Sequence, residues 1–140
     1  RNPIKVTSEI AKLQRAMLSN DTASMQQVLI SHIAAIPYAN RSKMEENYQN
    51  IIYSLFRLLG AEIHNEVHIN NGRIDCVIVN RDHIYIFEFK MNQPAKIAIA
   101  QIKEKGYANP YMSSGKPIAL IGINFSKRKR NIVEWLEEVI

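Results

Sequence analysis

The chain has 140 residues, of which 46% are hydrophobic and 22% are charged, and its formal net charge is +5. This composition is typical of a globular domain with a sizeable core, and no apolar run in the sequence approaches the ~20 residues of a membrane span. One cysteine, Cys76, excludes an internal disulfide and fits a reducing cytosol, so we expect a cytoplasmic protein, and the basic charge favours a polyanionic partner.

The N-terminal part of the sequence has the pattern of a helical hairpin. A first amphipathic helix is expected to end near Ser19, and a second is expected over about 23–36. Nothing in either helix indicates chemistry, and we interpret His32 as a surface or satisfied core histidine. We therefore predict a helical appendage over 1–40 and a second domain over 41–140. Because the first residue is not Met, we expect a fragment of a longer chain.

A third helix is expected over about 42–59, because its apolar positions repeat with helical spacing and Gly60 follows as a natural C-terminal stop. Its first turns carry Glu45 and Glu46. These acids either only favour the helix N-terminus through the dipole, or one of them reaches a cluster of carboxylates. The spacing leaves both alternatives open.

A strand is expected over 61–69, where polar and apolar residues alternate, and the turn 70–72 follows it. His64, Glu66 and His68 share one face of this strand. They could in principle form a zinc site, but we favour the polar face of an edge strand, which has the same pattern.

The stretch 72–90 has the pattern of two β-branched strands joined by a turn at 80–83, and both strands carry charged residues. A charge in a core strand costs free energy unless it is paired or binds a metal. A loop of two or of four residues gives the same register, with Asp75 directly opposite Glu88 and with Lys90 on the face of Glu88. Opposed Cβ atoms lie roughly 4.5–5.5 Å apart, so two carboxylates come together at a spacing that suits Mg²⁺ or Mn²⁺.

A helix is expected over 95 to about 108, with Gln101 away from its packed face, and a buried central strand is expected over 116–124. A basic run and an amphipathic stretch over 132–136 follow. The basic run is either a solvated turn or a contact to a phosphate backbone. The order helix, strand, strand, strand, helix, strand (αβββαβ) behind a helical hairpin predicts an α/β (α+β) fold with a mixed, roughly four-stranded sheet flanked by helices.

These features resemble the PD-(D/E)XK nuclease superfamily, whose fold is restriction-endonuclease-like. Gly-Arg-Ile-Asp75 and then Glu88-Phe-Lys90 at the end of the next strand carry the resemblance. Further matches are similar to the branch in which the nuclease-like domain follows an AAA-ATPase-like domain in bacterial proteins. They are Glu45 with Tyr48 three residues on, the helix end at Gly60, and the stretches 101–107 and 122–126.

The resemblance implies a divalent-metal-dependent nuclease acting on DNA. It implies that Asp75 and Glu88 bind Mg²⁺ (or Mn²⁺), that Glu45 completes the metal site, and that Lys90 stabilises the attacking water and the phosphate. It assigns Gln101 to a recurrent polar position behind the active strand. Candidate contacts to nucleic acid are Arg73, Lys127, Arg128, Lys129 and Arg130.

Three other interpretations stay open at this stage. The chain could bind nucleic acid without cutting it, or it could be an assembly module for an ATPase-like domain in the same full-length chain. The motif could also be a structural ion-pair cluster of Lys90 with Asp75 and Glu88. A cutter of both DNA strands would in addition need two sites, as in a homodimer.

Overall fold

The computed structural model describes residues 3–36, 55–57, 59, 66–69 and 75–140, and it describes side chains for the same residues except 3–7, 66–69 and 75. The chain forms two compact units, Arg1–His64 and Asn65–Ile140. The predicted boundary between residues 40 and 41 lies outside the described residues. Among the described helices, none is both long and apolar enough to cross a membrane.

The first unit contains the predicted helical hairpin, so that prediction is confirmed. Helix α1 spans Pro3–Leu18 and helix α2 spans Thr22–Ala34. The Asp21 side chain caps α2, because its Oδ1 accepts a hydrogen bond of 3.0 Å from the backbone N–H of Ser24. This bond and a second one from the Ser24 hydroxyl lower the pKa of Asp21. The chain reverses direction at Asn20, whose φ of 56° lies in the left-handed region that Asn tolerates.

Buried apolar residues on both helices form the interior of this unit, at the spacing of three and four that the sequence predicts. They include Leu13, Met17, Met25, Leu29 and Ile33. His32 contacts the buried carboxylate of Glu9 through its Nδ1, so it is a satisfied histidine, as predicted.

The third predicted helix, over 42–59, is described only near its end. Residues 55–57 and 59 are helical, and Leu55, Phe56 and Leu59 are buried. Its first turns, with Glu45 and Glu46, lie outside the described residues.

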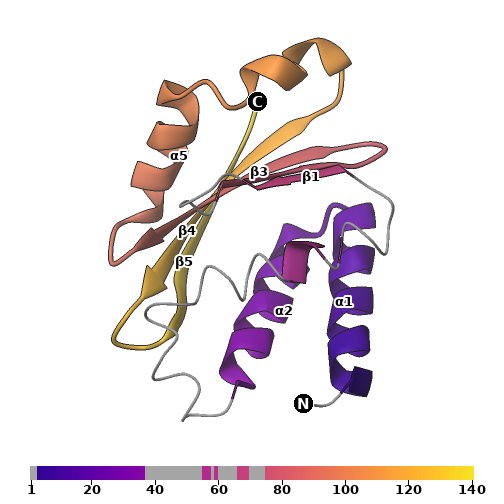
Figure 1. Ribbon diagram of the computed structural model, residues 1–140. Helices are drawn as coiled ribbons and strands as arrows, with labels where there is room; N and C mark the ends of the chain where they lie inside the picture. The colour runs from indigo at the N-terminus through magenta and orange to yellow at the C-terminus, as the bar shows by residue number, and fades with distance from the viewer. Residues whose placement is uncertain (1–2, 37–54, 58, 60–65, 70–74) are drawn as a thin grey trace. The chain divides into compact units, whose positions relative to one another are not determined.

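The second unit is a five-stranded mixed sheet with one long crossover helix (Figure 1). The strands are β1 (Glu66–Ile69), β2 (Asp75–Val79), β3 (Ile84–Met91), β4 (Ile118–Ser126) and β5 (Asn131–Val139), and they lie in this order across the sheet. Only β3 and β4 are parallel among these strands, and the other neighbours are antiparallel. The predicted α/β (α+β) class with a mixed sheet is confirmed.

Helix α5 (Ala95–Glu104) connects β3 to β4 and packs on one face of the sheet. It ends earlier than the predicted residue 108, because Gly106 takes a left-handed φ of 67° and stops the helix. The short 3₁₀ helix η1 (Asn109–Ser114) follows. Parallel neighbours require such a crossover, and here the crossover supplies the helical layer over β3 and β4.

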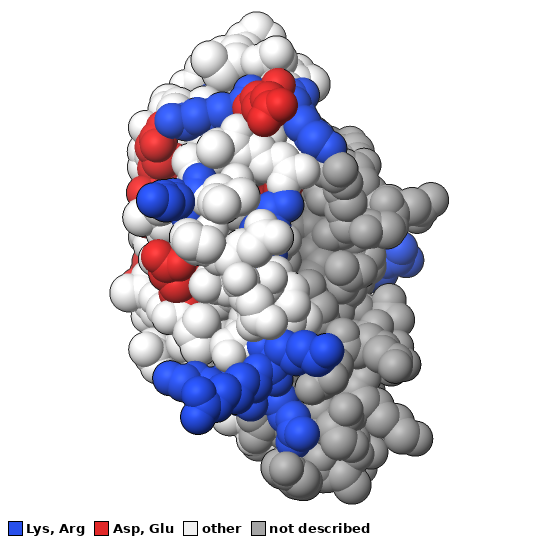
Figure 2. All heavy atoms as spheres, turned by 90° about the vertical axis from the view of Figure 1, so that its left-hand side faces the viewer, with Lys and Arg blue, Asp and Glu red and all other residues white. Residues whose placement is uncertain are grey.

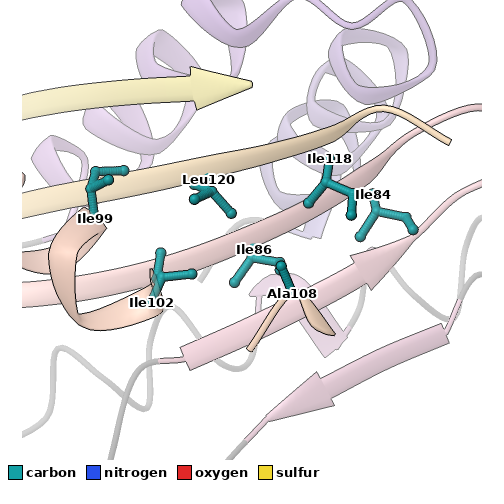
Figure 3. Packing of buried hydrophobic residues seen from close by; sticks show 7 residues of the cluster. All are labelled: Ile84, Ile86, Ile99, Ile102, Ala108, Ile118 and Leu120. Atoms are coloured by element: carbon teal, nitrogen blue, oxygen red, sulfur yellow. The ribbon is translucent and has the colours of Figure 1, made fainter. Parts of the chain in front are cut away.

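The core between α5 and the sheet is aliphatic (Figure 3). Its members are Ile84, Ile86, Ile99, Ile102, Ala108, Ile118 and Leu120. Alternate residues of β3 and β4 point towards the helix, which is the period of two that strands impose. Gly122 continues this face of β4. A Cβ atom on Gly122 would lie 2.4 Å from the carbonyl oxygen of Ala95, so only glycine lets α5 begin this close to the sheet.

The structure adds a fifth strand, β5, to the predicted, roughly four-stranded sheet. Residues 132–136 have an amphipathic pattern without strict alternation, and the structure explains it by a β-bulge. Phe125 pairs with Ile132 and Asn124 pairs with Glu134, so Val133 is an extra residue. The bulge places Ile132 and Trp135, three residues apart, opposite Phe125 and Ile123. This spacing is typical of a helix, so the sequence pattern does not indicate a strand here.

Candidate active site

The hairpin of β2 and β3 has the register that its sequence predicts. Asp75 is paired with Glu88, and the turn closes where the backbone N–H of Asn80 donates a bond of 2.9 Å to His83. The loop therefore has two residues, Arg81 and Asp82. An acidic residue of β2 is thus directly opposite an acidic residue of β3.

Glu88 is a charged residue in a buried strand. It is 3% exposed, and residues 84–89 of β3 are all buried. An isolated carboxylate in such a place would cost several kcal/mol, so a buried carboxylate is paired, hydrogen-bonded or bound to a cation. In this structure its Oε2 lies 3.3 Å from Nζ of Lys90.

Lys90 lies two residues after Glu88, on the same face of β3, which is why their charged groups can meet. The Lys90 side chain is 21% exposed and the Glu88 side chain is 4% exposed. The ammonium therefore lies where the buried strand reaches solvent.

The chain that follows Lys90 is held by polar groups of β4 and β5. Oδ1 of Asn124 accepts a bond of 3.2 Å from the backbone N–H of Gln93, and Oε1 of Glu134 accepts a bond of 2.7 Å from that of Ala95. Glu134 thus takes the place of a side-chain cap for α5, whose own N-cap residue, Pro94, makes no side-chain cap bond.

Asn92 adds two more bonds to this connection. Its backbone N–H donates to the carbonyl of Phe125 at 2.9 Å, and its Oδ1 accepts from the backbone N–H of Lys127 at 3.0 Å. Its φ of 55° is left-handed, a conformation that Asn adopts more readily than most residues.

Sequence reasoning missed Asn92, Asn124 and Glu134. An Asn in the turn Met-Asn-Gln-Pro is a local signal for a left-handed residue. Nothing local identifies the other two residues, because their partners lie 31 and 39 residues away in the sequence.

The other predicted site residues are placed only in part. Gln101 lies on α5 beside buried Ile102 and is itself half-buried. Glu45 and Arg73 lie outside the described residues, and for Asp75 only the backbone position is described. The roles assigned to these four residues stay predictions.

The four basic residues form the turn between β4 and β5. Lys127, Arg128 and Lys129 are exposed and Arg130 is half-buried with a φ of 55°. The turn is at the lower left of Figure 1. Figure 2, which views that side of the molecule, shows Lys and Arg side chains gathered in a patch at the same height. We call Lys127–Arg130 the basic turn.

The residues present fit a hard divalent cation. Glu88 offers carboxylate oxygens, the ligands that hard divalent cations prefer, and its partner across the sheet, Asp75, is a second acidic residue. Within the described part of the chain, no group of three His, Cys, Asp or Glu side chains is placed to hold a metal. A third carboxylate would come from outside it, as predicted for Glu45. The zinc alternative rests on His64, Glu66 and His68, whose side chains are not described.

Comparison with known proteins gives one family and one relative. A family model of the PD-(D/E)XK nuclease superfamily matches residues 43–135. The chain is 35% identical, over 97% of its length, to an uncharacterized protein in the vnfD 5′ region of Azotobacter chroococcum mcd 1, and it spans 28% of that relative's length. No solved structure matches the chain.

Proposed function

The chain belongs to the PD-(D/E)XK nuclease superfamily, and from this premise we propose that it is a divalent-metal-dependent nuclease that hydrolyses phosphodiester bonds of DNA. One observation carries the proposal. Buried Glu88 lies 3.3 Å from half-buried Lys90 and directly across the sheet from Asp75. It supports the proposal because an acid and an ammonium meet near the end of a buried strand, and a second acidic residue is paired with that strand.

Asp75, Glu88 and Glu45 would hold Mg²⁺ or Mn²⁺ through carboxylate oxygens. When bound, the ion activates a water molecule and stabilises the charge of the phosphoryl group during the displacement. Glu88 suits the ligand role because burial keeps its carboxylate in one place, so little ordering is needed when a cation arrives.

Lys90 would bind the phosphate and orient the attacking water. Its ammonium has three donors, of which Glu88 can use one, and its 21% exposure leaves room for a phosphate oxygen. We assign Lys90 the role of an electrostatic stabiliser of the phosphate and not that of a base. Gln101, on the helix that packs over β3, would help to orient these groups.

The test is cleavage of DNA by the purified chain with Mg²⁺ or Mn²⁺. We expect Asp75→Ala, Glu88→Ala and Lys90→Ala each to abolish cleavage while the circular dichroism spectrum stays that of the parent chain. Asp82→Ala is the matched control, because this exposed acid lies in the turn at the other end of the same hairpin. Full cleavage by purified Asp75→Ala would disprove the assignment.

A binding module would behave differently in the same experiment. It would bind DNA in a salt-sensitive way and would not cut it at any Mg²⁺ or Mn²⁺ concentration. That result would replace the nuclease proposal by a non-cleaving or assembly role.

The full-length protein is part of the proposal. We propose that this region follows an AAA-ATPase-like domain in a cytoplasmic bacterial protein, and that two copies act together where both DNA strands are cut. The match to only 28% of the relative supports a longer protein. The mass of the full-length protein in solution, measured with and without DNA, tests the homodimer.

A further inference from the structure

Charge is unevenly distributed along the last two strands of the sheet. The basic turn adds four positive charges in a row at the end where β3 finishes. Glu137 and Glu138 lie towards the other end, paired with Ile121 and Leu120. Glu134 also lies at the level of Lys90, paired with Asn124, and its carboxylate accepts the N–H of Ala95. With four basic residues against this one glutamate, the end of the hairpin near Lys90 is its more basic end.

The basic turn is close to Lys90 along the strands. In the parallel pair of β3 and β4, Lys90 is opposite Asn124, and the basic turn begins three residues later. At ~3.3 Å per residue, this places the start of the turn within about 10 Å of the level of Lys90. A strand of nucleic acid places one phosphate per ~3.4 Å of duplex axis, so a phosphate at Lys90 has neighbours within reach of the turn.

The basic turn is also fixed in place. The carbonyl of Ser126 accepts a bond of 2.7 Å from the N–H of Arg130, and the Ser126 hydroxyl accepts one of 3.1 Å from that of Lys129. Asn92, two residues past Lys90, accepts the N–H of Lys127 at 3.0 Å. One end of the turn is thus hydrogen-bonded to the connection that leaves the active strand.

The basic turn suits an extended polyanion better than a small anion. Three of its backbone N–H groups are used by Ser126 and Asn92, so the turn is not a nest of free N–H donors for one phosphate. Its exposed cationic side chains instead present several charges over a surface, as a sugar-phosphate backbone requires.

We infer that the basic turn binds the DNA phosphates next to the one at Lys90, and that Asn92 is the positioning residue that fixes the turn to the strand carrying Glu88 and Lys90. This inference rests on the proposed function and deepens it. It gives the site a sequence-independent contact to the DNA backbone. It also assigns two roles to different residues: the basic turn binds the DNA, and Asn92 aligns the bound DNA with Lys90.

The first experiment measures DNA binding by the full chain in EDTA, so that nothing is cut. Fluorescence anisotropy with a labelled DNA duplex is followed over a range of salt concentrations. For Arg128→Gln with Lys129→Gln, we expect roughly tenfold weaker binding near 0.1 M salt and a salt slope smaller by about 2.

The matched control is Arg81→Gln with Lys105→Gln. It removes the same charge from two exposed residues, one in the turn between β2 and β3 and one at the end of α5. We expect both its affinity and its salt slope to stay close to those of the parent chain. Equal losses in the two double variants would overturn the role of the basic turn.

The second experiment compares DNA affinity with kcat, to distinguish the binding of DNA from its alignment in the site. Asn92→Gly keeps the left-handed backbone and removes the acceptor oxygen, whereas Asn92→Asp keeps an oxygen at that position. We expect Asn92→Gly to bind DNA within twofold of the parent chain and to lose roughly tenfold in kcat, since a misplaced phosphate reacts slowly. We expect Asn92→Asp to recover kcat.

Two results would overturn the role of Asn92. One is an unchanged kcat in Asn92→Gly, and the other is a parallel fall in binding and kcat, which indicates general damage to the fold. The proposed function fails separately, if the parent chain does not cut DNA with Mg²⁺ or Mn²⁺. The anisotropy comparison still reports on the basic turn in that case.

Discussion

The chain buries a glutamate in each of its two units, and the two glutamates have different surroundings. Glu9 of α1 meets His32 of α2, 23 residues away, and their side chains are 10% and 14% exposed. Glu88 meets Lys90 on its own strand, and there the cation is 21% exposed. The first pair joins two helices and is closed to solvent on both sides. The second pair is formed by two residues of the same strand.

We interpret the first pair as structural and the second pair as part of the proposed site. A pair that bridges two elements stabilises their packing, so its loss should appear as a loss of stability. A pair within one strand adds little to the packing of that strand on its neighbours. Its carboxylate is nevertheless buried, and the burial of a carboxylate is unfavourable. A carboxylate that is buried in this way lowers the stability of the fold, so we expect it to serve a function other than packing.

Glu88→Gln should give the largest effect and the strongest test of this contrast. The substitution keeps the shape of the side chain and removes its charge. We expect cleavage to fall by at least ~10³-fold, because the proposed metal ligand is lost. The free energy of unfolding should change by less than about 1 kcal/mol, because the neutral amide is less costly to bury and Lys90 reaches solvent. Cleavage rates and urea unfolding of the same preparation check both values. A large loss of stability would make this pair structural, like that of Glu9.

Gly122→Ala should have the next largest effect and tests whether the surroundings of Glu88 depend on close packing. Gly122 is paired with Glu88, and a Cβ there would lie 2.4 Å from the Ala95 carbonyl. We expect a loss of about 2 kcal/mol or more, measured by urea unfolding, because α5 must move. Gly115→Ala is the control, with open space around its Cβ but a φ of 76°, and should cost only about 1 kcal/mol.

Glu9→Gln tests the other side of the contrast. We expect the free energy of unfolding to fall by about 1–2 kcal/mol, because His32 loses its charged partner in a mostly buried position. The cleavage rate per folded molecule should stay the same. A double-mutant cycle with His32→Gln, followed by thermal unfolding, isolates the contribution of the pair. A fall in kcat at full folding would contradict the purely structural role.

Tyr85 extends the contrast to a buried acid that is neutral at pH 7. Burial, and then Glu137, raise its pKa from 10.0 to about 12. The folded chain therefore keeps the phenol proton at a pH where the unfolded chain has lost it, so stability is full below pH 10 and falls towards pH 12. At pH 11 we expect a loss of about 1 kcal/mol from this group. Denaturant unfolding between pH 9 and 11.5 should show a smaller decline in Tyr85→Phe.

The register of the active strands could be predicted from the sequence, and the contacts around them could not. The pairing of Asp75 with Glu88 follows from alternation and a short turn, which are local properties. The strand β5 was hidden because its bulge at Val133 gives helical spacing to apolar residues. Asn124 and Glu134 accept hydrogen bonds from the backbone just before and at the start of α5. These bonds depend on how β4 and β5 pair, and no local sequence pattern predicts that pairing.

The bulge in β5 also affects how the molecule meets copies of itself. β5 is the last strand of the described sheet, and Val133, Leu136 and Val139 on it are exposed. An open edge with apolar side chains is a template for aggregation by strand addition. The bulge interrupts a regular row of backbone donors and acceptors along β5. The irregularity that obscures this strand in the sequence thus also makes its edge a poorer template for strand addition.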